Sequence, residues 1–576
     1  LAGGAGGELD ESVVEELAAI KTVDGIVDWI VEHTAAKAAN SEETGAERSA
    51  AEGELVGGAR FPLRRFVVEP GPLPAVGARG SALPGGLPGD GALLAGGRFA
   101  VVEGGLGVGL EIADLLEQAG ATVRLLDAGA ADLAEVVAGG VAADGLLWVA
   151  ALDAAAGSAA ELPGAFAALR AAALGGTRRL VLASGLGGDF GRRGGAAATD
   201  PAPVAGAGFA GFARTLAHEL PDVTVRVVDV DPKDAPRRIA ESLLAELVAE
   251  HAPLVVGYRD GTRAALRVLP AELTAQSPGA EPPVLDSSSV VLLTGGARGI
   301  TAKVALEIAR RHGAHIELVG RTAPPAGPED PATAAAADAP ALRRALIATG
   351  MRRPAEIEAR VARLLAGREV RATLAELGRT AASVRYHAVD VRDGAAVRAV
   401  VADVYARHGR LDGVVHGAGV LEDRLVKDKT PDSFARVYST KVDGARALLA
   451  ALRRDRGPRF VALFGSVAGV FGNRGQVDYA AANDTLDTLA HAHAGVLTTS
   501  ADLAGTPGRV VSVDWGPWRA EGGGMVSAEL EREYARRGIG LIEPAEGVDA
   551  LLRELAAPTG PAQVVYMCGE VDAFYG

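Results

Sequence analysis

The segment FVALFGSVAGVFGNRGQVDYAAAND, residues 460–484, decides the fold of this chain. Its first residues, Phe460 to Phe464, are apolar and predict a buried β-strand, and the small residues around Ser466 predict a turn after it. A helix is expected to open at Asp478 and Tyr479. Ligands bind at the carboxyl ends of the strands in open α/β sheets, so the hydroxyls of Ser466 and Tyr479 are expected to lie together at that edge.

Two further polar residues complete a candidate catalytic site. Thirteen positions separate Ser466 from Tyr479, Asn483 follows one helical turn later, and Lys441 stands 25 residues before Ser466 in a segment that reads as a helix. Here the sequence resembles the ketoreductase domains of polyketide and polyunsaturated fatty acid synthases, a branch of the short-chain dehydrogenase/reductase family. The resemblance implies that these four residues are catalytic. Taken singly, each has a plain structural alternative in a turn, a helix end or a surface.

The resemblance also implies a reaction, the reduction of a ketone by NADPH, in which the alkoxide must be protonated as it forms. Tyr479 is the expected acid, and the ammonium of Lys441 is expected to lower the phenol pKa from about 10. Ser466 would hydrogen-bond the carbonyl oxygen, and Asn483 would hold a water in a proton relay. Ordinary short-chain dehydrogenases carry lysine at the position of Asn483, and this exchange resembles the synthase enzymes.

A glycine-rich turn predicts the dinucleotide site. An apolar strand leads into TGGARGIT, residues 294–301, where glycines permit a sharp turn and the next helix N-terminus favours a pyrophosphate. Thr301 replaces the usual third glycine. Arg298 in the turn and Arg321 after the second strand form a candidate clamp for a 2′-phosphate, which favours NADPH over NADH; alternatively, either is an ordinary surface residue.

Further cofactor contacts follow from the resemblance: an adenine-contacting pair at Asp390 and Val391, a segment from His416 that lines the nicotinamide ribose, and a tryptophan loop that covers the nicotinamide. The expected cofactor-binding residues are Thr294, Gly295, Ala297, Arg298, Gly299, Ile300, Arg321, Asp390, Val391, His416, Gly417, Ala418, Pro517 and Trp518.

The implied substrate is a β-ketoacyl thioester on the phosphopantetheine arm of an acyl carrier protein. Asp423 ends a Val-Leu-Glu-Asp run close to the Leu-Asp-Asp signature of B-type ketoreductases, and Phe471 stands where A-type enzymes have tryptophan. A 3R alcohol is therefore expected. Met525 lies in a glycine-rich loop, residues 520–537, that is expected to act as a mobile lid over the substrate.

Strand–glycine turn–helix–strand patterns begin at Arg98 and again at Ser289. They predict an α/β fold of two tandem Rossmann-like, doubly wound parallel sheets. The first half has no lysine between Lys37 and Lys233, and Ala198 stands where the second half has Tyr479. We therefore expect a degenerate, structural half at 59–286 and a catalytic half at 287–576; a surviving nucleotide site in the first half is the alternative.

Three other segments stand apart. Residues 1–34 resemble the end of an acyl carrier protein domain without its Asp-Ser-Leu motif, although a solvated helical leader is an alternative, and residues 35–58 read as a linker. Residues 323–382 form a low-complexity and then helical insertion, which resembles the ketoreductases of polyunsaturated fatty acid and enediyne synthases. The insertion is either a surface excursion or a docking element for a neighbouring domain of the same synthase.

Composition excludes several function classes. The formal net charge of −15 argues against a general partner among nucleic acids or anionic membranes, and the single Cys568 excludes an intramolecular disulfide or a multi-cysteine metal site, so no metal is expected. The first 30 residues lack a signal-peptide pattern and no apolar run reaches about 18 residues, so a cytoplasmic protein is expected. A free-standing reductase of small ketones and a non-catalytic scaffold remain competing interpretations.

Overall fold

The computed structural model describes residues 61–74, 94–192, 204–249, 252–273, 285–324, 327–453, 457–496, 508–519, 528–557 and 559–575. The chain from Pro62 onward belongs to one unit, and the elements named below all lie in it. The predicted carrier-protein remnant at 1–34, the linker at 35–58 and the position of Met525 fall outside the described residues.

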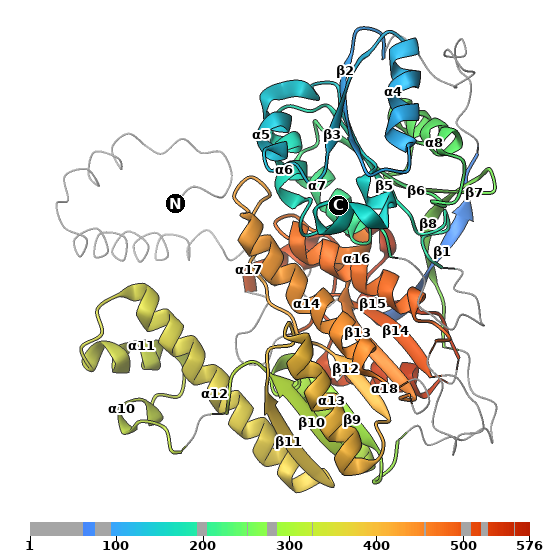
Figure 1. Cartoon of the computed structure of the whole chain (residues 1–576). Coiled ribbons are helices and arrows are strands. Elements are labelled where there is room, and N and C mark those ends of the chain that lie inside the picture. Colours follow the sequence, from blue (N-terminus) through green and yellow to red (C-terminus); the bar gives the residue numbers. More distant parts are fainter. Residues whose placement is uncertain are drawn as a thin grey trace, which may run out of the picture. The chain divides into compact units, whose positions relative to one another are not determined.

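The second half builds a parallel sheet in the order β11-β10-β9-β12-β13-β14-β15 (Figure 1). Its strands are β9 (Val290–Thr294), β10 (His315–Gly320), β11 (Ser383–Ala388), β12 (Gly413–His416), β13 (Phe460–Ser466), β14 (Arg509–Trp515) and β15 (Gln563–Cys568). The order reverses between β9 and β12, which is the switch point where α/β sheets bind ligands. The strand predicted at 460–464 is therefore β13, beside this switch point.

The first half repeats the scheme in the order β3-β2-β4-β5-β6-β7. Its strands are β2 (Arg98–Glu103), β3 (Thr122–Asp127), β4 (Gly145–Trp148), β5 (Arg179–Ser184), β6 (Thr224–Asp229) and β7 (Val255–Arg259). Within the described residues no strand lies outside β3, whereas β11 occupies the equivalent edge in the second half. The α/β Rossmann-like fold expected from the sequence is confirmed.

The two parallel sets are continuous, which differs from the expectation of two separate sheets. Strand β1 (Leu63–Pro72) pairs antiparallel with β15 on one side and with β8 (Thr262–Pro270) on the other, and β8 pairs with β7. The described residues thereby form one sheet of 15 strands. Two antiparallel strands join the halves because β15 and β7 would otherwise leave unpaired edges facing each other.

Helices cover both faces of this sheet. In the second half α9 (Gly299–His312) packs against α12 (Pro354–Thr380) and α18 (Pro544–Ala556), while α13 (Gly394–His408), α14 (Pro431–Ala451) and α16 (Val477–Ala492) pack side by side. The helices α4 (Val108–Gln118) and α8 (Pro236–Val248) pack together in the first half. Thr430 caps α14, accepting a hydrogen bond from Ser433 N at 3.2 Å, and Pro431 opens the helix.

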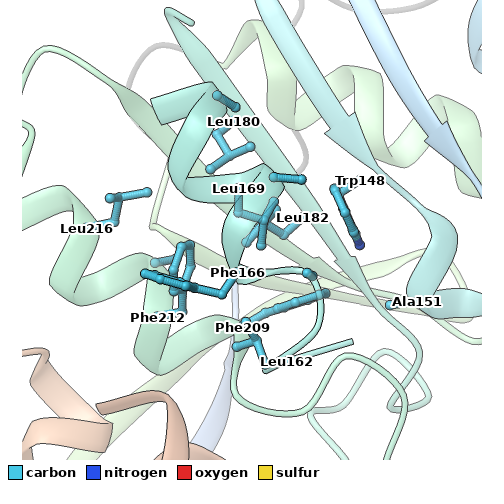
Figure 2. Packing of buried hydrophobic residues seen from close by; sticks show 14 of the residues in the cluster. Trp148, Ala151, Leu162, Phe166, Leu169, Leu180, Leu182, Phe209, Phe212 and Leu216 are labelled. Carbon is cyan, nitrogen blue, oxygen red and sulfur yellow. The ribbon is translucent and has the colours of Figure 1, made fainter. Parts of the chain in front are cut away.

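The core of the first half is aromatic where it meets the second. Figure 2 shows Phe166 of α6 (Phe166–Leu174) among Leu162, Leu169 and Phe212, the last on α7 (Phe209–Glu219). The ring of Phe166 also stacks on Phe434 of α14, with ring centroids 4.2 Å apart. One hydrophobic core therefore runs from the first half into the helices of the second.

The predicted insertion is helical. It contains α10 (Pro331–Ala334), α11 (Ala339–Ala348) and the long α12 (Pro354–Thr380), with a small core of Leu342, Leu346, Ile357 and Val361. The remaining short elements include α5 (Leu133–Val136), α15 (Val467–Phe471) and α17 (Ala528–Arg536). Across the described ranges, none of these helices combines the length and apolar character needed to span a bilayer.

Candidate active site

The predicted catalytic residues come from three neighbouring elements at the carboxyl end of β13. Ser466 ends β13 and caps α15, its Oγ accepting a hydrogen bond from Ala468 N at 3.2 Å. Tyr479 lies in the first turn of α16, with Asn483 one turn later, and Lys441 lies on α14. The contact between α14 and α16 brings Lys441 to Tyr479, so the structure places all four residues together.

Burial raises the pKa of Tyr479 above its ordinary value, and the side chains of Ser466 and Asn483 beside the phenol oppose the rise without cancelling it. The side-chain amide of Asn483 also donates to Tyr479 O at 2.7 Å. Its Oδ1 is buried and has no hydrogen-bond partner among the residues that the structure describes.

Lys441 lies beside the ring of Tyr479. Its Nζ lies 5.1 Å from the ring centroid and donates to Phe464 O at 2.6 Å. Burial lowers the pKa of this amine to about 8, although the carboxyls of Asp514 and Asp487 act to raise it. The sequence predicts a tyrosine pKa lowered by Lys441; the pKa is instead raised, because desolvation of the phenol outweighs the bonds that favour its ionised form.

His416 joins the nucleotide turn to the lysine helix. Its Nε2 lies 2.8 Å from Lys441 O and its Nδ1 lies 2.8 Å from Thr294 Oγ1. A carbonyl only accepts, so Nε2 donates and Nδ1 accepts from the threonine hydroxyl. Burial lowers the pKa of His416 to about 4. The sequence predicts that the segment from His416 lines a ribose, and the structure adds that this imidazole is a buried, neutral link between Thr294 and the backbone of Lys441.

The glycine turn has the close approaches expected of a phosphate-binding turn. Gly295 has φ +73°, and a Cβ there would lie 3.0 Å from Gly417 O. A Cβ on Gly417 would lie 2.1 Å from Thr301 Oγ1, so Gly417 makes room for the threonine that replaces the third glycine. Ala297 is buried beneath the turn, while Arg298 is exposed and Ile300 half-buried at the start of α9.

Glu369, on the insertion helix α12, meets this turn. Its Oε1 accepts from Gly299 N at 2.7 Å and its Oε2 accepts from Arg298 Nε at 3.2 Å. The other predicted arginine, Arg321, is exposed at the end of β10. A protein carboxylate therefore sits on the donors that the sequence assigns to a cofactor phosphate.

The remaining predicted cofactor residues lie around the same edge. Asp390 follows β11 and pairs with Arg392 at 2.7 Å, Val391 is buried, and Ala418 N lies 3.4 Å from Thr294 Oγ1. Pro517 is half-buried after β14, but the ring of Trp518 packs into protein, 4.9 Å from the Trp515 ring. The sequence predicts that the loop containing Trp518 covers the nicotinamide. In the structure the Trp518 side chain is buried against its protein neighbours.

The predicted stereocontrol residues differ in placement. Asp423 is exposed and accepts a hydrogen bond at 2.9 Å from Nε2 of Gln476, the residue before α16. Phe471 is buried and stacks on Phe574 at 5.4 Å, in a core with Val565 and Met567. The structure therefore holds Asp423 beside the start of α16 and Phe471 in a hydrophobic core.

A buried ion pair behind Tyr479 was missed from the sequence. Lys429 Nζ lies 2.7 Å from Asp478 Oδ2 and also donates to Glu422 O, and both charged side chains are buried. Asp478 directly precedes Tyr479, so the pair fixes the start of α16. The only signal in the sequence was a lysine just before the Thr430-Pro431 helix start.

The first half also reaches the catalytic segment. From α7, Arg214 Nη1 donates to Gly469 O at 2.6 Å, Thr215 Oγ1 accepts from Asn473 N at 3.1 Å, and Glu219 accepts from Gly475 N at 2.8 Å. Deeper in, Arg192 donates to Gln563, whose Nε2 donates to Asp514 at 2.7 Å. The three contacts from α7 hold the loop between Ser466 and Tyr479.

The glycine turn of the first half is closed by its own strand. Glu103 at the end of β2 accepts from Gly105 N at 3.2 Å and from Gly107 N at 3.1 Å. The carboxylate occupies the backbone donors that a phosphate would use. The turn at Gly104–Gly109 is thus satisfied internally.

The alternating strands and helices and the site at the switch point define a Rossmann-like α/β fold. Within it, residues 289–520 match the model of the KR domain family. This confirms the resemblance to ketoreductases of polyketide and polyunsaturated fatty acid synthases.

Among curated proteins, a polyunsaturated fatty acid synthase polypeptide of Thraustochytrium sp. is 32% identical over 370 residues, covering 62% of this chain and 12% of that protein. Polyketide synthase PksN of Bacillus subtilis is 27% identical over 362 residues, covering 62% of this chain and 6% of PksN. The chain thus spans a small fraction of the relatives it matches.

Among solved structures, the first ketoreductase of the tylosin polyketide synthase has a TM-score of 0.61 at 24% identity, covering 88% of this chain and 93% of that one. The ketoreductase from the first module of phoslactomycin biosynthesis in Streptomyces sp. HK803 has a TM-score of 0.59 at 23% identity, covering 89% and 95%. These likenesses extend over both halves of the fold.

Proposed function

We propose that the chain is an NADPH-dependent reductase that converts a β-ketoacyl thioester, carried on the phosphopantetheine arm of an acyl carrier protein, into the 3R β-hydroxyacyl thioester. It would act beside other domains of a cytoplasmic polyketide or polyunsaturated fatty acid synthase. The observation that carries the proposal is the meeting of Ser466, Tyr479, Asn483 and Lys441 beside a glycine turn at the sheet's switch point.

The residues of the turn fit a phosphorylated dinucleotide. Glycines at 295 and 299 have positive φ, the long helix α9 starts there, and Arg298 and Arg321 are both exposed. The turn backbone would hold the pyrophosphate, and the two arginines would hold the 2′-phosphate. When bound, NADPH supplies the hydride.

The side chains of the chain supply the rest of the chemistry. Ser466 and Tyr479 would both hydrogen-bond the ketone oxygen, and Tyr479 would give its proton to that oxygen. Its raised pKa keeps the phenol protonated at neutral pH, as an acid requires. The unpartnered Oδ1 of Asn483 is suited to accept from a water, which would return a proton to Tyr479.

The halves would divide the work. Residues 287–576 would be catalytic, and residues 59–286 would be structural, because Glu103 closes the first glycine turn and α7 braces the catalytic loop. The exposed Asp423 would guide the substrate to give the 3R alcohol. The free-standing reductase of small ketones has less support, because a small-ketone enzyme needs no bracing half.

The test is turnover of a β-ketoacyl N-acetylcysteamine thioester, followed by the loss of NADPH absorbance. Wild-type protein should reduce the thioester to the 3R alcohol on chiral chromatography, and Tyr479→Phe should lose turnover while keeping its affinity for NADPH. Turnover of small ketones alone would favour the free-standing reductase. If neither the thioester nor small ketones are reduced, the interpretation as a non-catalytic scaffold is favoured. Loss of NADPH binding in Tyr479→Phe would mean that the tyrosine has another role.

A further inference from the structure

The insertion helix α12 places an acidic side chain on the proposed cofactor turn. Glu369 takes a hydrogen bond from the main chain of Gly299, at the N-terminus of α9, and another from the guanidinium of Arg298. Both donors are suited to a phosphate, because a helix N-terminus and a guanidinium each favour oxyanions. A carboxylate and a phosphate cannot occupy the same donors together.

The backbone around Glu369 is fixed on both sides. Its neighbour Arg368 is bound to Glu329 through two bonds, of 2.9 and 2.7 Å, and to the carbonyls of Thr333 and Ala336 within the insertion. On the other side, Val370 and Leu377 are buried where α12 packs on α9 and β11. The side chain of Glu369 therefore reaches the turn from a packed helix, in a defined position.

The contact is nevertheless open to exchange. The side chains of Glu369 and Arg298 are 45% and 57% exposed, and exposed ion pairs of this kind contribute about 1 kcal/mol or less. Glu103 in the first half differs, because it belongs to the strand beside its turn and one of its oxygens is buried. The glycine turn of the first half is thus bound by Glu103 from its own strand, whereas the glycine turn of the second half is bound by the exposed Glu369 from the insertion.

We propose that Glu369 is a specificity-determining residue, which competes with the 2′-phosphate of the dinucleotide for Arg298 and with its pyrophosphate for the amide of Gly299. Binding of NADPH displaces the carboxylate and loosens α12 at that point, so the insertion and the cofactor site are coupled. The inference rests on the proposed function, since it concerns the same cofactor site.

Glu369→Gln tests the competition, with Glu376→Gln as the matched control. Glu376 lies on the same helix and pairs with Arg379, so its substitution removes an equal charge without touching the turn. Dissociation constants for NADPH and NADH are measured by calorimetric titration of the wild type and the two variants. Glu369→Gln should bind NADPH about three- to fivefold more tightly, as expected for removing an ion pair worth up to about 1 kcal/mol, with less than a twofold change for NADH.

Unchanged or weaker NADPH binding in Glu369→Gln, or an equal gain in Glu376→Gln, would overturn the inference while leaving the reductase intact. A complete lack of dinucleotide binding by all three proteins would instead overturn the proposed function. Hydrogen exchange tests the coupling: NADPH should raise the exchange of amides at 366–372 in the wild type. No change there would refute the coupling of α12 to the cofactor.

Discussion

The close contact between α7 and the catalytic helix α16 gives the sharpest prediction. Gly211, in the first turn of α7, faces Ala480, the residue after Tyr479. A Cβ at Gly211 would lie 2.2 Å from Ala480 O and 2.9 Å from Asp484 Cβ, so the methyl of Gly211→Ala must push the two helices apart by about 1 Å. Because the obstructing oxygen is backbone, no side-chain rotation relieves the clash.

Two opposing effects set the magnitude. Overpacking of a core costs about 1–3 kcal/mol, and the short contact here favours the upper end, while glycine to alanine in a helix returns up to about 1 kcal/mol. Gly211→Ala should therefore lower the free energy of unfolding by about 2 kcal/mol. Displacement of Ala480 also moves Tyr479, and a 1 Å misplacement in an active site costs roughly 100-fold in turnover.

Gly378 provides the matched control, because it lies in the last turn of α12 and a Cβ there meets nothing within 4 Å. Gly378→Ala should raise stability by up to about 1 kcal/mol and leave turnover unchanged. Urea unfolding followed by circular dichroism, together with kcat on the N-acetylcysteamine thioester, measures both variants. A Gly211→Ala protein as stable and active as Gly378→Ala would refute the bracing of α16 by α7.

Two further predictions concern buried charges. The pKa of Lys441 is about 8, so its ammonium is present below that pH and lost above it, and turnover should fall as the pH rises through about 8. Asp514→Asn removes a negative charge that raises the pKa of Lys441, so this variant should lose turnover at a lower pH. A pH profile that is flat through pH 9 in both proteins would count against a role for the ammonium. Lys429→Met strands the carboxylate of Asp478 and should cost about 3–5 kcal/mol in urea unfolding, most of it recovered by adding Asp478→Asn. A cost no larger than that of Glu358→Gln, which breaks an exposed pair with Arg343, would argue that the buried pair adds nothing.

Local patterns in the sequence predicted several elements of this fold correctly. The apolar run from Phe460 and the turn at Ser466 gave a strand at 460–466, and α16 opens at Val477, one residue before the predicted start. These signals are short-range, because a strand and its turn depend on neighbours in sequence. The same holds for the glycine turn at Thr294.

The features that the sequence does not reveal arise from contacts between distant segments. Nothing near His416 indicates that Thr294 and Lys441 O will capture its ring, and nothing near Glu369 fixes the register of α12 against α9. The raised pKa of Tyr479 likewise depends on the depth of the site, which the spacing of four residues does not reveal. Such properties belong to tertiary packing.

The pairing of β1 with β15 has a consequence for anyone who grafts the second half of this chain into another protein. A graft that began at residue 287 would lack β1, so one edge of β15 would be left unpaired and could pair with strands of other chains and cause aggregation. It would also lack α7, which packs against α16. Fusion junctions should therefore be placed upstream of Leu63, so that the last strand of the graft finds its own partner.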